Sequence, residues 1–373
     1  MSSPAGHGPL RKVTAVSLAA VLSLASASQV MVIKLSQTNP SADRFTDIVS
    51  PYPYHYTSIP LLSDLLKLAV STVFLMRESP EKRKVTIAWW SMRLYIVPGV
   101  CYFLHNNLMF MVLGDVQPWA YMIIANLKIA TTAVMFRLLL GRKLTKLQWH
   151  ALVLLVVGTL ISQIDDCSRH GILAVPYRSL FKGFLLGFFS AMAGTYTEMF
   201  LRANDDSLYW QNCQMYAVGV ASNSLNVLLQ GLISGRSQFP LLPSEVLAGF
   251  NTCAWLSVLV LASAGLLVSW IMKYTNTVVK VYSNIAGMAL TIMASYVMLD
   301  IKMGLPAMLG FSTVCTGSAL YYLGLRELFG VEAAREFLGF DPSSSLPSHT
   351  RASTHPSLLS VDVTRTPESS KGT

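Results

Sequence analysis

The chain has 373 residues, of which 53% are hydrophobic and only 13% are charged, and its formal net charge is +9. An average soluble domain is about one-quarter charged, so this composition excludes an ordinary soluble protein and indicates an integral membrane protein. The positive balance comes from short connections rich in Lys and Arg. No basic helix with interleaved aromatic residues suggests nucleic-acid binding.

Ten apolar runs follow one another along the chain. Each is long enough, at ~17 to 25 residues, to cross ~30 Å of hydrocarbon as a helix. The pattern therefore predicts an all-α polytopic membrane protein with one ten-helix domain over residues 13–327, after a short cytosolic N-terminus at 1–12. The expected spans are 13–36, 57–77, 92–113, 118–140, 147–164, 181–201, 209–233, 249–271, 278–299 and 304–325.

The basic connections predict the orientation. Most of the clustered Lys and Arg residues lie in RESPEKRK (77–84), in GRKLTK (141–146) and at Arg11–Lys12. In the ten-span order all three lie on the same side of the membrane. By the positive-inside rule that side is cytosolic, so both chain termini are expected in the cytosol.

The first span has a second interpretation. Arg11–Lys12, the apolar run that follows and the small residues at 25–27 also fit a cleaved signal peptide. The apolar run continues to Lys34, however, which is too long for the core of such a peptide. Removing it would also leave an odd number of spans, so we expect the first span to be retained.

The end of the chain differs in composition. Residues 328–373 are rich in Ser, Thr and Pro and hold few large apolar residues, so they cannot bury enough surface to offset the entropy of ordering. We expect a disordered cytosolic tail. The scattered cysteines show neither a disulfide framework nor metal-ligand spacing, and no metal or cofactor is expected. They are Cys101, Cys167, Cys213, Cys253 and Cys315.

Two hairpins resemble each other. LLLGRKLTKLQWHAL (138–152) and VMLDIKMGLPAMLGF (297–311) each contain the end of one span, a short polar turn and the start of the next. In the ten-span order the first turn is cytosolic and the second luminal, so the two copies would be inverted. Many carriers build a midplane site from inverted repeats. A chance likeness between two apolar hairpins explains the match equally well.

Lys128 lies about ten positions from either end of the fourth span, with no acidic residue at i±3 or i±4. A lysine at a helix centre costs ~2.5 to 3.5 kcal/mol on insertion scales, so it normally faces the bundle interior or a wet cavity. We expect Lys128 to bind an anionic ligand. A structural partner on another helix is the alternative.

Two other charged pairs have a simpler explanation. Asp64 and Lys67 are one helical turn apart, and Glu198 and Arg202 are spaced i,i+4, so each pair is expected to be a structural ion pair. Lys280, near the start of the ninth span, has two interpretations: it faces the same cavity as Lys128, or it snorkels to the cytosolic interface.

Asn106 and Asn107 follow His105 in the middle of the third span. Adjacent helical residues cannot face the same way, so we expect one asparagine to bridge helices and the other to need a different partner. An amide pair beside an unpaired lysine would suit a base or sugar edge next to a phosphate. Aromatic side chains that could stack on such a ligand, or simply pack, are Tyr102, Tyr121, Tyr196 and Tyr216.

Six blocks in serial order carry a family resemblance: HNNLMF, YMIIANLKIATTAV, GRKLTKLQW, AGTYTEMFLR, SLYWQNCQMY and GLLVSWIMKYTNTVVKVYS. From about residue 57 to 325 the chain resembles the nucleotide-sugar transporters, in the branch of the CMP-sialic acid, UDP-galactose and UDP-N-acetylglucosamine carriers. The resemblance implies ten helices in two inverted five-helix repeats, about 13–164 and 181–325. It also implies residence in the Golgi or ER and exchange of a cytosolic nucleotide sugar for a luminal nucleoside monophosphate.

The same resemblance implies a set of ligand-binding residues, to which Tyr102 is added from the aromatic candidates. The remaining members of this set are Asn106, Asn107, Tyr121, Lys128, Tyr196, Asn212, Tyr216, Ser269 and Lys280.

Departures from the branch pattern bear on the substrate. The branch commonly has Gln-Asn-Asn where this chain has His105-Asn106-Asn107. The branch also often has Tyr-Gln followed by another aromatic residue, where this chain has Tyr121-Met122 and then Ala125. The plant carriers grouped with the CMP-sialic acid transporters look most similar, notably around VVKVYS, yet plants make little use of sialic acid. We therefore expect a UDP-sugar, UDP-galactose first, with CMP-sialic acid as the alternative.

Two further classes are weighed against transport of nucleotide sugars. A membrane-bound glycosyltransferase would need a luminal acidic or metal motif, for which Asp165-Asp166 is the one candidate. A drug or metabolite exporter of the same superfamily would share the fold but would gain nothing from Lys128 and Lys280. We therefore expect a transporter rather than an enzyme, and a homodimer is kept open.

Overall fold

The structure is a computed structural model. It describes residues 9–37, 51–81, 83–87, 92–140, 144–164, 177–203, 206–233, 242–274, 277–301 and 303–338. The chain divides into two units, Met1–Gly324 and Leu325–Thr373, and the candidate site lies in the first. The side chains of Glu198, Arg202 and Lys280 lie outside this description, as do Asp165–Asp166 and residues 339–373.

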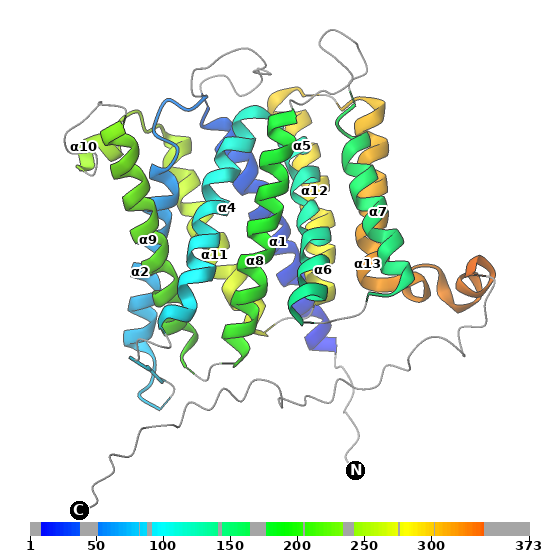
Figure 1. The fold of residues 1–373 in the computed structure, drawn as a ribbon, viewed down its shortest axis with the longest axis horizontal. Helices are drawn as coiled ribbons and strands as arrows, with labels where there is room; N and C mark the ends of the chain where they lie inside the picture. The colour runs from blue at the N-terminus through cyan, green and yellow to red at the C-terminus, as the bar shows by residue number, and fades with distance from the viewer. Residues whose placement is uncertain are drawn as a thin grey trace, which may run out of the picture. The chain divides into compact units, whose positions relative to one another are not determined.

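Every regular element in these residues is a helix (Figure 1). Three of the starts have local causes: Thr145 and Gln148 form a capping box before α7, Pro118 occupies the first turn of α5, and the Asn251 side chain accepts from Ala254 N at 2.7 Å at α11. The helices are α1 (Pro9–Leu35), α2 (Ser58–Arg77), the 3₁₀ turn η1 (Arg93–Tyr95), α4 (Ile96–Asp115), α5 (Pro118–Ala125), α6 (Leu127–Leu140), α7 (Lys146–Ile161), α8 (Tyr177–Ala203), α9 (Leu208–Ile233), α10 (Pro243–Val246), α11 (Thr252–Tyr274), α12 (Thr277–Leu299) and α13 (Leu305–Leu338).

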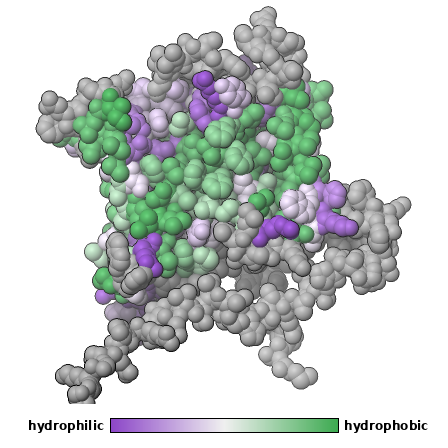
Figure 2. Space-filling view, in the orientation of Figure 1, coloured by the Kyte–Doolittle hydropathy of each residue, from purple (hydrophilic) through white to green (hydrophobic). Residues whose placement is uncertain are grey.

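The described helices have the character of a polytopic membrane protein. Five of them contain stretches long and apolar enough to cross a bilayer, and three shorter apolar helices accompany them. Figure 2 shows hydrophobic residues covering the middle of the visible face, with hydrophilic residues gathered toward its two ends. The five stretches are Ser58–Arg77, Arg93–Asp115, Tyr177–Leu201, Leu208–Ile233 and Thr252–Ser269.

Helices occupy the positions of the expected spans, with two departures. The fourth is interrupted at Asn126, which separates α5 from α6. The last continues to Leu338, past residue 328 where the tail is expected to begin, and the disorder of the tail stays a prediction. Glu, Ala, Arg and Leu are strong helix formers and dominate this stretch. The full ten-span count and the inverted repeats stay predictions.

The site is built where α2, α4, α9 and α11 meet. In this region α2 packs against α9 and α11, while α4 packs against α8 and α9. Glycine lets α4 and α9 approach closely, because a Cβ atom on Gly99 would lie 2.7 Å from the Val218 side chain. These four helices carry the polar side chains of the bundle interior described below.

The end of α1 is hydrogen-bonded to the end of α4. The last carbonyl groups of a helix have no donor within it, and at the end of α4 the donors come from another helix. Lys34 Nζ donates to Leu113 O at 3.3 Å and to Val116 O at 3.1 Å. Gln37 Nε2 also donates to Leu113 O, at 2.9 Å. The end of α4, nine residues beyond Asn106, is therefore tied to the end of α1.

Candidate functional site

A polar cavity of about 130 Å³ lies in the interior of the first unit. Its walls come from α2, α4, α9 and α11, with Gln29 contributed by α1. A pocket that holds a whole drug-sized ligand measures roughly 300 to 1,000 Å³, so this cavity accommodates part of such a molecule. The polar residues on its wall include Asp64, Lys67, Tyr102, His105, Asn106 and Ser269.

The predicted ion pair on α2 is confirmed, and it forms part of this wall. Lys67 Nζ lies 2.6 Å from Asp64 Oδ1, and the two residues are only 5% and 4% exposed. A buried pair repays the cost of desolvation only when further hydrogen bonds satisfy its remaining atoms. Residues of α9 and α11 surround this pair and make its further contacts.

Two glycines make room for the pair. A Cβ atom on Gly219 of α9 would lie 2.5 Å from Asp64 Oδ2, and one on Gly265 of α11 would lie 3.0 Å from Lys67 Cδ. Real Cβ atoms essentially never approach another atom as closely as the first distance. The ion pair therefore occupies a space that side chains at these two positions would fill.

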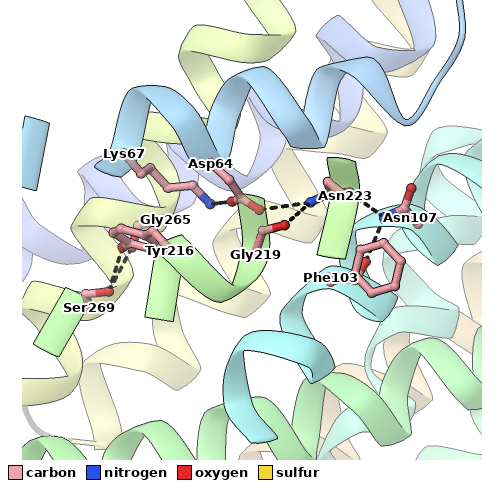
Figure 3. A network of polar contacts seen from close by, with 9 residues as sticks. All are labelled: Asp64, Lys67, Phe103, Asn107, Tyr216, Gly219, Asn223, Gly265 and Ser269. Carbon is pink, nitrogen blue, oxygen red and sulfur yellow. Dashed lines mark hydrogen bonds and ion pairs between the residues drawn. The ribbon is translucent and has the colours of Figure 1, made fainter. Parts of the chain in front are cut away.

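A chain of amides links the carboxylate to α4 (Figure 3). Asn223 Nδ2 donates to Asp64 Oδ2 and to Gly219 O, both at 3.0 Å. Asn107 Nδ2 donates to Asn223 Oδ1 at 3.0 Å and to Phe103 O at 2.9 Å. Asn107 is thus the asparagine that bridges helices, while its neighbour on α4 faces the cavity.

A second chain of contacts runs from the ammonium to α11 (Figure 3). Lys67 Nζ lies 4.9 Å from the ring centroid of Tyr216, a geometry that permits a cation–π interaction. Tyr216 Oη lies 3.2 Å from Ser269 Oγ. Because Ser269 Oγ donates to Gly265 O at 3.2 Å, the tyrosine hydroxyl is the donor in this pair.

His105 joins the cavity wall to α8. Its Nδ1 lies 3.3 Å from Leu186 O. A carbonyl oxygen only accepts, so Nδ1 carries the hydrogen and Nε2 of the neutral ring is left as an acceptor. The branch that the chain resembles commonly has glutamine at this place, which would present both a donor and an acceptor; His105 presents only the acceptor Nε2 on this side of its ring.

Lys128 lies at the first turn of α6, directly after the break at Asn126. It does not belong to the wall of the cavity, but it is close enough to His105 for the two groups to interact electrostatically. In the described part of the chain its ammonium has neither an ion pair nor a hydrogen bond. The paired role expected for Lys128 and Lys280 stays a prediction.

The other predicted ligand residues are placed apart from the cavity wall. Tyr121 of α5 is buried in the apolar core. Tyr196 of α8 packs on Phe200, with 5.9 Å between the ring centroids. Asn212 of α9 is buried, and its Oδ1 has no partner among the described residues. Of the predicted set, the structure brings together Tyr102, Asn106, Tyr216 and Ser269 around the cavity.

Sequence reasoning assigned Asp64 and Lys67 a structural role alone and overlooked Asn223. A signal for Asn223 was present, because it is an amide in the middle of an apolar span, where such groups commonly bond across helices. Nothing in the local sequence of Gly219 or Gly265 indicates the atoms that they face. Those contacts depend on the packing of α9 and α11 against α2.

Comparisons with known proteins agree with this architecture. A sequence profile of the nucleotide-sugar transporters matches residues 11–322. One solved structure, 14% identical, covers 83% of this chain and 99% of its own with a TM-score of 0.50, which is a likeness of fold alone.

Similar sequences are named as transporters rather than enzymes. CMP-sialic acid transporter 1 of Oryza sativa subsp. indica is 39% identical, over 83% of this chain and 95% of that protein. Its namesake in Arabidopsis thaliana is 38% identical, over 82% and 88%. UDP-galactose translocator 1 of Caenorhabditis elegans is 27% identical, over 72% and 78%. The chain therefore belongs to the nucleotide-sugar transporter family.

Proposed function

We propose that this protein exchanges a cytosolic nucleotide sugar for a luminal nucleoside monophosphate in the Golgi membrane, with both termini in the cytosol. The observation that carries the proposal is the cavity inside an apolar bundle, walled by a buried ion pair and by uncharged donors and acceptors. Ionisable groups at such depth are costly and usually mark a substrate pathway. The cavity is the part of that pathway that recognises the ligand.

The charges favour an anionic ligand. Asp64 and Lys67 neutralise each other, whereas the charge of Lys128 is not balanced by an acidic partner in the described residues. Nucleotide sugars and nucleoside monophosphates both carry about two negative charges near neutral pH. Lys128, together with Lys280 on α12, binds the phosphate that the two ligands share.

The amide and aromatic residues suit the uncharged parts of the ligand. Asn106, Tyr102 and Ser269 line the cavity, and they can hydrogen-bond to sugar hydroxyls or to a base edge. The cavity is smaller than a whole nucleotide sugar, so the transport cycle must widen it. Alternating access, in which one part of the bundle rocks against the other around the site, provides that widening.

UDP-galactose is the first candidate substrate, and CMP-sialic acid is its competitor. His105 stands where the branch that the chain resembles commonly has glutamine, and its acceptor nitrogen changes the hydrogen bonds that this wall of the cavity offers to a sugar. Relatives at 38–39% identity nevertheless bear the name CMP-sialic acid transporter. The two substrates differ in base as well as in sugar, so one exchange assay separates them.

The test is uptake of labelled nucleotide sugars into proteoliposomes that hold the purified protein. Vesicles preloaded with UMP are expected to accumulate UDP-galactose far faster than empty vesicles. Faster uptake of CMP-sialic acid by vesicles preloaded with CMP would instead select the competitor. Equal uptake by loaded and empty vesicles would overturn obligatory exchange.

A further inference from the structure

The break at Asn126 has a specific hydrogen-bond arrangement. The backbone N–H of Asn126 donates to Ile123 O at 3.1 Å, a 3₁₀-type bond that leaves Met122 O without its usual i+4 donor. The side chain of the same asparagine replaces that donor, because its Nδ2 lies 2.7 Å from Met122 O. In a membrane such freed backbone groups must be satisfied internally, so Asn126 stabilises the break that it creates.

Helix α12 holds the other end of this side chain. Asn284 Nδ2 donates to Asn126 Oδ1, and Asn126 Nδ2 also contacts Met288 Sδ at 2.8 Å. Asn284 and Met288 are one turn apart, so a single face of α12 meets the break. The residues in contact are about 160 positions apart along the chain. We call the pair Asn126–Asn284 the amide clamp.

Helix α8 fixes the same turn from another side. A Cβ atom on Gly187 would lie 3.0 Å from Lys128 N, so the backbone at Lys128 rests directly on α8. Thr131 Oγ1 lies 3.1 Å from Gly187 O, within hydrogen-bond distance. The first turn of α6 is therefore held between α8 and the amide clamp.

We infer that Asn126 and Asn284 are positioning residues that aim Lys128 at the phosphate of the ligand. This inference rests on the proposed function. If the clamp is lost and the one residue Asn126 relaxes from 3₁₀ to α geometry, the helix that follows turns by about 20° and shifts by about 0.5 Å along its axis. Lys128, two residues after the break, moves with it.

The clamp also links the two helices that carry the lysines proposed to bind phosphate, Lys128 and Lys280. Asn284 lies one turn after Lys280 on α12, and Asn126 lies two residues before Lys128. A contact between the two asparagines therefore sets the spacing between the segments that carry the two lysines. Movement of α12 during transport would act directly on the helix turn that presents Lys128.

The experiment is a double-mutant cycle on the purified full-length protein, with Asn284→Ala, Lys128→Ala and the double variant. Competition binding measures the Kd of UMP, CMP, uridine and cytidine for each. Loss of one charge-assisted bond lowers affinity roughly tenfold or more, so this is the loss expected for Lys128→Ala with the monophosphates. Asn284→Ala is expected to lower monophosphate affinity by about threefold to tenfold and to leave nucleoside affinity unchanged.

In the double variant Asn284→Ala is expected to cause no further loss of monophosphate affinity, since the Lys128 ammonium that Asn284 positions is gone.

Two controls accompany the cycle. Asn226→Ala removes another interhelical amide, which lies 3.4 Å from Thr57 Oγ1, and is expected to leave all four affinities unchanged. Asn284→Ser retains a small polar group on α12 and supplies the same test if Asn284→Ala does not fold.

Three results separate the possible failures. Equal losses for nucleosides and monophosphates in Asn284→Ala would overturn the positioning role in favour of a general structural one. Additive losses from Asn284→Ala and Lys128→Ala would also overturn it, because the two residues would then act independently. A Lys128→Ala variant that binds monophosphates as tightly as the parent would refute the phosphate role in the proposed function instead.

Discussion

Asp64→Ala is expected to destabilise the protein strongly, because it leaves the Lys67 ammonium buried without its carboxylate. The two charged atoms lie 2.6 Å apart, and Lys67 is only 5% exposed. The substitution also removes the acceptor of one Asn223 hydrogen bond. Both consequences follow from packing that places the pair inside the bundle.

The size of the effect can be worked out from these contacts. At this separation and an effective dielectric constant of about 20, the Coulomb attraction is about 6 kcal/mol. Much of it offsets the cost of desolvating the two charges, and removing one partner of a buried pair typically costs about 3 to 5 kcal/mol. Replacing both by apolar residues is often close to neutral, so Asp64→Ala/Lys67→Met is expected to recover most of the lost stability.

Thermal unfolding of the three purified proteins in the same detergent tests this order. At an unfolding entropy of ~2.1 cal/mol/K per residue, a loss of about 3 kcal/mol in the unit Met1–Gly324 lowers Tm by roughly 4 to 5 °C. The double variant is expected between Asp64→Ala and the parent. The reasoning is refuted if Asp64→Ala unfolds at the same temperature as the parent, or if the double variant is less stable than the single one.

Three further outcomes are expected. Gly219→Ala should lower Tm because its Cβ would lie 2.5 Å from Asp64 Oδ2, although alanine normally favours a helix by about 1 kcal/mol; an unchanged or raised Tm would count against the contact. Asn106→Ala should change the preference between UMP and CMP, or among sugars, more than phosphate-dependent binding in competition assays, and an equal loss for every ligand would contradict this. Tags at either terminus should be accessible when the plasma membrane alone is permeabilised, whereas a tag near Gly171 should stay protected. A protected N-terminus would instead support the signal-peptide interpretation.

The sequence alone was sufficient for the features that depend on composition and on neighbouring residues. Apolar runs of about 20 residues specify membrane helices whatever they pack against, so the helices fall where they were expected. The Asp64–Lys67 pair was also predictable, because residues three positions apart share a helix face. Lys128 stood out because no acidic residue lies one turn away on its own helix.

Only the tertiary structure decided which of these groups meet. Asp64 and Asn223 are 159 positions apart, and no local pattern indicates that they share a hydrogen bond. The same holds for the choice of Asn107 over Asn106 as the helix bridge, and for the contact of Asn284 with the break at Asn126. Periodicity reveals which face of a helix is polar, but the partner of each polar group is selected by the packing of distant helices, where a buried donor must find an acceptor.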